Sequence, residues 1–191
     1  WILNGYTGIF DMCTGAGKTF TALATMVHLA KVLDDKLAVF IVCPYIHLVS
    51  QWEEDVVQWT SVPVIIAHSK SPDSEWKKNL LKAYKRFKKD GTPFVCITTN
   101  DSFAGDEIQQ YITRFSNEQN VLLIVDEAHN FGSQQMINVM PWNIKKRIAL
   151  SATIKRYMDK SGTRKLEEYF GEKCIDLWRK ARRKSTFPSA F

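Results

Sequence analysis

The chain has 191 residues, 45% of them hydrophobic and 24% charged, which is typical of a folded domain and excludes a chain disordered throughout. No apolar run approaches the ~20 residues that span a bilayer, the N-terminus lacks a signal-peptide pattern, and the four cysteines form no CxxC pair of a zinc site. The net charge of +6 comes mostly from the end of the chain, because residues from Leu177 onward hold five basic and no acidic residues and leave 21 basic and 20 acidic residues before them. We therefore expect a cytoplasmic or nuclear protein without a membrane partner, in which net charge alone is weak evidence for nucleic-acid binding.

Short apolar segments alternate along the chain with longer amphipathic segments. The predicted strands are Gly8–Met12, Leu37–Cys43, Val62–Ala67, Pro93–Thr98, Val121–Asp126 and Arg147–Ser151. The predicted helices are about Gly17–Asp34, His47–Thr60, Asp73–Lys89, Ser102–Phe115 and Arg164–Phe170. Several strands are apolar throughout, as are parallel strands that helices cover on both faces. The alternation predicts an α/β fold with a mostly parallel sheet and helices on both of its faces.

The predicted helix Asp73–Lys89 is strongly basic. Seven Lys or Arg residues lie in it among apolar residues at helical spacing, so its apolar face should pack on the domain. Its basic face is either an ordinary solvated surface or one that contacts phosphates, and the sequence leaves both open.

The residues after the first strand have the composition of a phosphate-binding loop. They are Thr14, Gly15, Ala16, Gly17, Lys18 and Thr19, and they open the first predicted helix. Glycines let successive N–H groups point at phosphate oxygens, and the start of the helix adds donors and a positive dipole end. In this arrangement Lys18 reaches the β- and γ-phosphates and the Thr19 hydroxyl binds Mg²⁺. One departure is Met12, where the general pattern has glycine; the alternative is a glycine-rich turn before a surface helix.

Two acids, Asp126 and Glu127, follow the apolar strand Val121–Asp126. Ligands of parallel sheets gather at the carboxyl ends of the strands, where the loop at residues 14–19 also lies. Asp126 is then placed to hold Mg²⁺, and Glu127 to polarise the water that attacks the γ-phosphorus. We further expect His129 to link the ATP site to the neighbouring strand. The alternative is that the two acids form a solvated turn.

Together these residues resemble three motifs of the superfamily 2 helicases and translocases. Met12–Thr19 resembles their first motif, Asp126-Glu127-Ala128-His129 has the DEAH form of the second, and Ser151-Ala152-Thr153 matches the third. The resemblance implies a RecA-like P-loop NTPase domain that uses ATP and Mg²⁺. It also implies that Ser151 and Thr153 transmit the state of the γ-phosphate to the nucleic-acid side.

Weaker resemblances fill the intervals between these motifs. Val42–Tyr45, followed by Gln51-Trp52, and Ile97–Asn100 resemble segments that hold the nucleic-acid backbone in this superfamily. The resemblance implies contacts from Pro44, Tyr45, Thr98 and Thr99; the alternative for each segment is an ordinary loop. Tyr169-Phe170-Gly171 and the Gln51-Trp52 pair favour the branch that contains restriction-enzyme motor subunits and the excision-repair helicase.

The resemblance covers about residues 8–171. We expect residues 1–171 to be the first RecA-like domain, truncated at its N-terminal end, and 172–191 to be a basic tail or linker. The adenine-recognising glutamine motif of the family and its second RecA-like domain are missing from this sequence. Because that second domain supplies arginine fingers worth ~10³–10⁵ in turnover, the isolated domain should bind Mg-nucleotide weakly and hydrolyse it slowly.

The function that this resemblance implies is ATP-driven unwinding of, or movement along, a nucleic acid, with DNA favoured over RNA. One alternative is another P-loop enzyme such as a kinase, but no acceptor pocket or arginine-rich lid is evident. A second alternative is a nucleotide-gated scaffold or remnant domain of a larger assembly.

Overall fold

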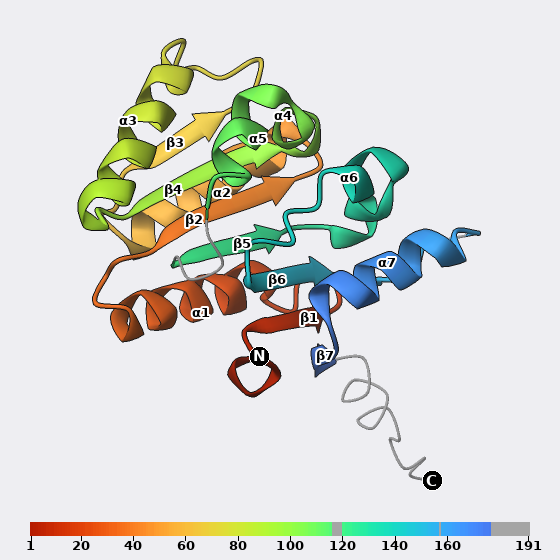
Figure 1. Cartoon of the computed structure of the whole chain (residues 1–191). Helices are drawn as coiled ribbons and strands as arrows, with labels where there is room; N and C mark the ends of the chain where they lie inside the picture. Colours follow the sequence, from red (N-terminus) through yellow and green to blue (C-terminus); the bar gives the residue numbers. More distant parts are fainter. Residues whose placement is uncertain (116–119, 157, 177–191) are drawn as a thin grey trace, which may run out of the picture.

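Seven strands lie side by side in one sheet, in the order β3-β4-β2-β5-β6-β1-β7 (Figure 1). The computed structural model describes residues 1–115, 120–156 and 158–176. The strands are β1 Thr7–Asp11, β2 Ala38–Cys43, β3 Val64–Ala67, β4 Phe94–Thr99, β5 Val121–Val125, β6 Lys146–Ser151 and β7 Lys173–Asp176. Every strand pairing among the described residues is parallel, which confirms the predicted α/β class.

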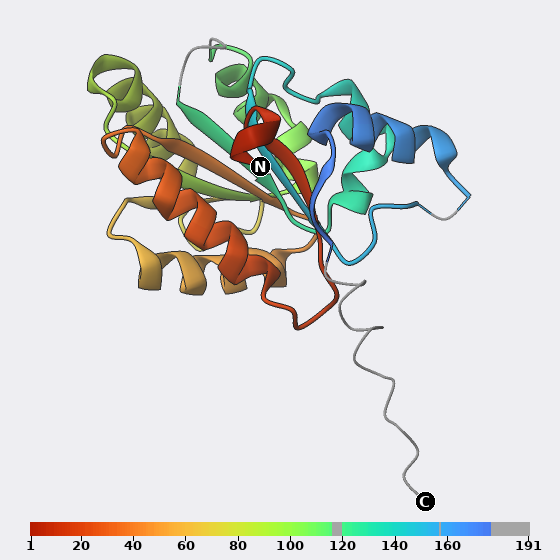
Figure 2. The same cartoon turned by 90° about the horizontal axis from the view of Figure 1, so that it is seen from below.

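Helices cover both faces of this sheet (Figure 2). The α-helices are α1 Lys18–Val32, α2 Ile46–Trp59, α3 Trp76–Asp90, α4 Asn100–Ala104, α5 Asp106–Ile112, α6 Gln134–Asn138 and α7 Lys160–Phe170, and the 3₁₀ helices are η1 Ile2–Asn4 and η2 Ala128–Gly132. Helices α1 and α2 pack on one face, and α3 to α7 pack on the other. Within the described residues, no helix has the length and apolar character needed to cross a membrane.

Strand β2 shows how the sequence produces these layers. Val39, Ile41 and Cys43 join the core cluster under α1 and α2, whereas Phe40 and Val42 join the cluster under the helices of the opposite face. Successive side chains of a strand point to opposite faces, so a strand buried on both must be apolar throughout.

The structure differs from the sequence prediction in several places. The helix predicted at Ser102–Phe115 is two helices, because Gly105 between α4 and α5 has an extended backbone (φ −78°, ψ 153°). The short helices η2 and α6 between β5 and β6 were not predicted. Strand β7 was not predicted either, and it lies in the segment 172–191 that was expected to be a tail; residues 177–191 lie outside the described residues.

The strand order brings the predicted motifs together. Strands β5, β6 and β1 are neighbours in the sheet, and the acid pair, the Ser-Ala-Thr segment and the glycine-rich loop follow them respectively. Backbone hydrogen bonds continue the sheet past the strand ends, from the Met12 N–H to the Ser151 carbonyl (3.0 Å) and from the Asp126 N–H to the Val42 carbonyl (2.8 Å). The three motifs therefore share one edge of the sheet, the carboxyl edge.

Candidate active site

The loop between β1 and α1 curls in the way that its glycines permit. Gly15 and Gly17 have φ values of 78° and 83°, in the left-handed region that favours glycine. Gly17 is the N-cap of α1, a 15-residue helix that begins at Lys18. The predicted phosphate-binding residues 14–19 thus surround a helix N-terminus, where free N–H groups and the helix dipole favour an anion.

Met12 occupies the position at which the general pattern has glycine. Its side chain is buried and packs with Phe10 and the apolar face of α1. A methionine fits here because the chain is still extended along the sheet and turns only after this residue.

The acid pair faces this loop from the end of β5. The Lys18 Nζ atom lies 3.2 Å from Glu127 Oε1, which joins residues that are 109 positions apart in the sequence. Glu127 has φ 44° and ψ 52°, a left-handed conformation that is uncommon for a residue with a side chain. Asp126 lies deeper, with 8% of its surface exposed. The structure therefore brings together Lys18, Asp126 and Glu127.

Asp126 has a partner that the sequence did not reveal. The indole N–H of Trp52, on α2, donates a 2.9 Å hydrogen bond to Asp126 Oδ2, and the Glu127 N–H donates one of 2.8 Å to Asp126 Oδ1. Burial raises the pKa of Asp126, while these two donors and the nearby Lys18 ammonium lower it. Burial is the largest effect, so the charged carboxylate is less stable here than in water.

A chain of polar contacts leads from the acid pair to β6. His129 Nδ1 lies 3.4 Å from Glu127 Oε2 and 3.3 Å from the Ser151 hydroxyl oxygen. The buried Ser151 hydroxyl donates to the Thr153 carbonyl (2.7 Å) and accepts from the Thr153 N–H (3.2 Å). The three residues predicted to couple the site to the neighbouring strand are thus in contact, and Glu127 is the acid that they reach.

The glycine-rich loop and the acid pair line a cleft of about 450 Å³ at the carboxyl edge. Its lining contains Thr14, Gly15, Gly17, Lys18 and Thr19 from the loop, Asp126 and Glu127 from the acid pair, and Leu48, Gln51, Asp55 and Trp59 from α2. From the sequence, Gln51 was placed with the segments expected to hold nucleic acid and not at the ATP site, and Asp55 and Trp59 were not singled out. The spacing of three and four places these α2 residues on one face of a helix, but nothing in that spacing indicates that the face borders a phosphate loop.

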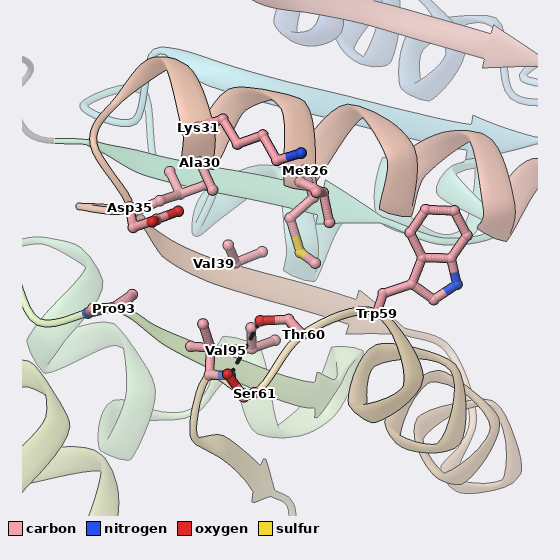
Figure 3. Close-up of a pocket in the computed structure, with 13 residues that line it drawn as sticks. Met26, Ala30, Lys31, Asp35, Val39, Trp59, Thr60, Ser61, Pro93 and Val95 are labelled. Atoms are coloured by element: carbon pink, nitrogen blue, oxygen red, sulfur yellow. Dashed lines mark hydrogen bonds between the residues drawn. The ribbon is translucent and has the colours of Figure 1, made fainter.

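A second cavity, of about 290 Å³, opens near the opposite edge of the sheet (Figure 3). Met26, Ala30 and Lys31 of α1 line it together with Val39 and Val95, which lie near the starts of their strands. Its residues are mostly apolar, and Trp59 is the one that it shares with the cleft among the residues that line each. It contains none of the predicted site residues, so we assign the chemistry to the cleft.

The predicted nucleic-acid contacts also lie at the carboxyl edge, but they differ in exposure. Tyr45 is 56% exposed and its ring stacks on His47, whereas Pro44 beside it is half-buried. Thr98 is fully buried and its hydroxyl donates to the Ala67 carbonyl. The Thr99 hydroxyl accepts from the Ser102 N–H and caps α4. The hydroxyl groups of both threonines are therefore used within the fold, and Tyr45 is the exposed member of the set.

The comparison with protein-family models identifies the family. The model described as "Type III restriction enzyme, res subunit" (ResIII) matches residues 4–156. The chain belongs to the ResIII family. This confirms the resemblance to superfamily 2 motors and to their restriction-enzyme branch, and family membership implies the use of ATP. No match was found among curated proteins.

Solved structures with the same fold as this ResIII domain include the following three. A nuclease-deletion mutant of the Type ISP restriction-modification enzyme LlaGI, solved with a DNA substrate mimic, is 22% identical over 95% of this chain, with a TM-score of 0.67. The SWI2/SNF2 ATPase core of Sulfolobus solfataricus, in complex with dsDNA, is 17% identical over 88% of the chain (TM-score 0.60). The Hef helicase domain of Pyrococcus furiosus is 18% identical over 88% of the chain (TM-score 0.62). At these identities the likeness establishes the RecA-like fold, and this chain spans only 19%, 32% and 35% of the three proteins respectively.

Proposed function

We propose that the chain is the first RecA-like domain of an ATP-dependent motor that moves along or unwinds DNA, with Mg-ATP bound in the 450 Å³ cleft. The observation that carries the proposal is the convergence of Lys18, Asp126 and Glu127 at a loop with a free helix N-terminus. Membership in the ResIII family supports the motor. Two of the similar structures were solved with DNA or a DNA substrate mimic, which supports DNA over RNA.

The donor set suits magnesium. The Thr19 hydroxyl and the Asp126 carboxylate both line the cleft and offer the hard oxygen ligands that Mg²⁺ prefers. A cation beside Asp126 would also offset the cost of burying its charge. When bound, the ion supplies charge neutralisation across the β- and γ-phosphates.

The residues of the chain have separate roles in phosphate binding, water activation and coupling. The loop N–H groups of residues 14–19 hold the phosphates, and Lys18 exchanges its contact with Glu127 for the β- and γ-phosphate oxygens. This exchange frees Glu127 to orient a water molecule and accept its proton. His129 and Ser151 then report the state of Glu127 to β6, since they form the polar path that leaves it.

The proposed motor needs parts beyond this chain. A second RecA-like domain of the same parent protein would close the cleft and bring arginine fingers, so residues 1–171 alone should hydrolyse ATP slowly. Along the carboxyl edge, Tyr45 and the backbone around Pro44, Thr98 and Thr99 would hold DNA phosphates without reading bases. Affinity for DNA should therefore fall steeply as salt rises.

The first test is Mg²⁺-dependent binding of a fluorescent ATP analogue to the chain and to two matched variants. Lys18→Ala removes the proposed phosphate contact, whereas Lys31→Ala removes an exposed lysine from the far end of the same helix. We expect Lys18→Ala to abolish binding and Lys31→Ala to leave it unchanged. Equal binding by all three proteins would overturn the assignment of the cleft.

The second test is the ATPase rate of the parent protein with and without DNA. A motor is stimulated by DNA, whereas a nucleotide-gated scaffold or a kinase is not. A rate unaffected by DNA, with nucleotide binding intact, would retain the ATP site and reject the motor.

A further inference from the structure

Trp52 connects the candidate site to helix α2. This residue is 1% exposed, and its indole N–H, which is its one hydrogen-bond donor, points to Asp126 at 2.9 Å. The two residues are 74 positions apart, on α2 and at the end of β5. A buried tryptophan is commonly just a large core residue. Here, however, the indole N–H binds Asp126, the residue that we propose as a magnesium ligand.

The bond restricts the carboxylate. Asp126 Oδ1 accepts from the Glu127 N–H at 2.8 Å and Oδ2 accepts from Trp52 at 2.9 Å, so both oxygens are held and the group cannot rotate without losing a hydrogen bond. Each carboxylate oxygen has about two acceptor positions, so each retains one for a further partner. Among the described residues, Trp52 is the only side chain that donates a hydrogen bond to Asp126.

The surroundings make this donor hard to replace. Asp126 is 8% exposed and follows β5, with buried Val125 before it and buried Cys43 at the end of the neighbouring strand. In such surroundings a carboxylate that loses a donor recovers little from water. It would turn toward another partner, and the positive group that lies close to it is the Lys18 ammonium.

We propose that Trp52 is a positioning residue, whose indole N–H holds the Asp126 carboxylate in the orientation in which it binds the magnesium ion of Mg-ATP. The inference rests on the proposed function, because it assumes that Asp126 is the metal ligand. It adds a residue outside the glycine-rich loop, the acid pair and the Ser-Ala-Thr segment to the working site.

The same bond joins the metal ligand to the nucleic-acid side. Helix α2 begins at Ile46, directly after Pro44 and the exposed Tyr45, and Trp52 follows less than two turns later.

The test separates the N–H from the bulk of the side chain. Trp52→Phe keeps a large aromatic ring and removes the donor, and Trp76→Phe makes the same chemical change in the core on the opposite face of the sheet. Binding of a fluorescent ADP analogue is measured as Mg²⁺ is titrated, and again in EDTA, with no turnover required.

We expect Trp52→Phe to raise the Mg²⁺ concentration for half-maximal binding by roughly tenfold, as loss of a hydrogen bond to a charged group does. Affinity in EDTA should stay the same, and Trp76→Phe should change neither value. An unchanged Mg²⁺ requirement in Trp52→Phe, with normal Mg²⁺-dependent binding by the wild type, would overturn this inference alone. A wild type whose nucleotide binding ignores Mg²⁺ would instead overturn the proposed metal site.

A second measurement does not depend on the folding of a variant. The chain contains six tryptophans, and each gives an indole ¹H–¹⁵N signal. In the nucleotide-bound wild type, adding Mg²⁺ should shift the assigned Trp52 indole signal and leave that of Trp76 in place. A Trp52 signal that does not respond to Mg²⁺ would contradict the proposed contact.

Discussion

The two edges of the sheet are built from the same strands but have opposite character. At the carboxyl edge, apolar strands give way to Asp126, Ser151 and the glycine-rich loop, which surround a polar cleft. At the amino edge, a mostly apolar cavity lies between α1 and the starts of β2 and β4. Parallel strands all point the same way, so the polar loops after β1, β5 and β6 collect at one edge. Substitutions at the carboxyl edge should therefore change chemistry, and those at the amino edge should change stability.

The largest effect should come from Glu127→Gln in the parent protein. The amide keeps the size of the side chain but cannot accept a proton from water, so turnover should fall by about 10²–10⁴-fold while nucleotide binding persists. DNA-stimulated ATPase and nucleotide binding are measured side by side. Glu54→Gln, on the exposed side of α2, is the control and should behave as wild type. A Glu127→Gln enzyme with a normal rate would show that another group is the general base.

The next effect concerns the polar contacts that lead from Glu127 to Ser151 on β6, between the ATP site and the nucleic-acid side. Ser151→Ala removes the hydroxyl that lies between His129 and Thr153, so stimulation of the ATPase by DNA should drop by roughly tenfold. The basal rate and nucleotide affinity should change much less. Ser74→Ala, at an exposed position, provides the control. If DNA stimulates Ser151→Ala as strongly as the wild type, the path from Glu127 to β6 does not carry the coupling.

A substitution at the amino edge should show the reverse pattern. Val39 is buried beside the apolar cavity, and Val39→Ala enlarges it, so the free energy of unfolding should fall by about 1 kcal/mol. Chemical denaturation measures this loss. Nucleotide affinity should be unchanged, and a weakened affinity at native temperature would show that the two edges are not independent.

The smallest effect should be a pH-dependent change of stability at the site itself. Because burial raises the pKa of Asp126, the folded chain keeps a proton that the unfolded chain has already lost. Stability is therefore fully present below the ordinary carboxyl pKa and is lost as pH rises through the raised one. Asp126→Asn has no charge to desolvate, but its amide nitrogen cannot accept one of the two hydrogen bonds that the carboxylate accepts from Trp52 and Glu127. In EDTA its Tm relative to wild type should therefore rise by roughly 2 °C between acid and neutral pH, equivalent to ~0.5–1 kcal/mol.

The pH series provides the check on that prediction. The Tm of Asp126→Asn relative to wild type should be lowest at low pH, where Asp126 is neutral in both states, and should increase as pH rises. A difference independent of pH would mean that it does not come from the buried charge. Mg²⁺-dependent nucleotide binding should be lost in the same variant, which would separate function from stability at one residue.

Local pattern was sufficient to predict most of the sheet and the central residues of the site. All six predicted strands are present, several of them as the apolar runs that burial on both faces requires. Lys18 and Glu127 lie in motifs that could be recognised from their residues alone, and the parallel sheet brings these motifs together. Strand β7 was not predicted because the outermost strand of a sheet needs few apolar residues, and Lys173–Asp176 has only two between its charged ends.

The remaining features depend on tertiary geometry. The contact from Trp52 to Asp126 spans 74 residues, and no local spacing marks an indole that will face a carboxylate. The prediction for Thr98 had the same weakness. Its hydroxyl is buried and donates to the Ala67 carbonyl of β3, so a role in holding DNA would fall to the backbone.

The most direct test of the account is a crystal structure of this domain with Mg²⁺ and a non-hydrolysable ATP analogue. The account predicts a triphosphate over residues 14–19, with the ion between the Thr19 hydroxyl and the Asp126 carboxylate and with Lys18 moved from Glu127 to the phosphates. A nucleotide bound in another part of the domain, with Asp126 and Glu127 remote from its phosphates, would contradict it.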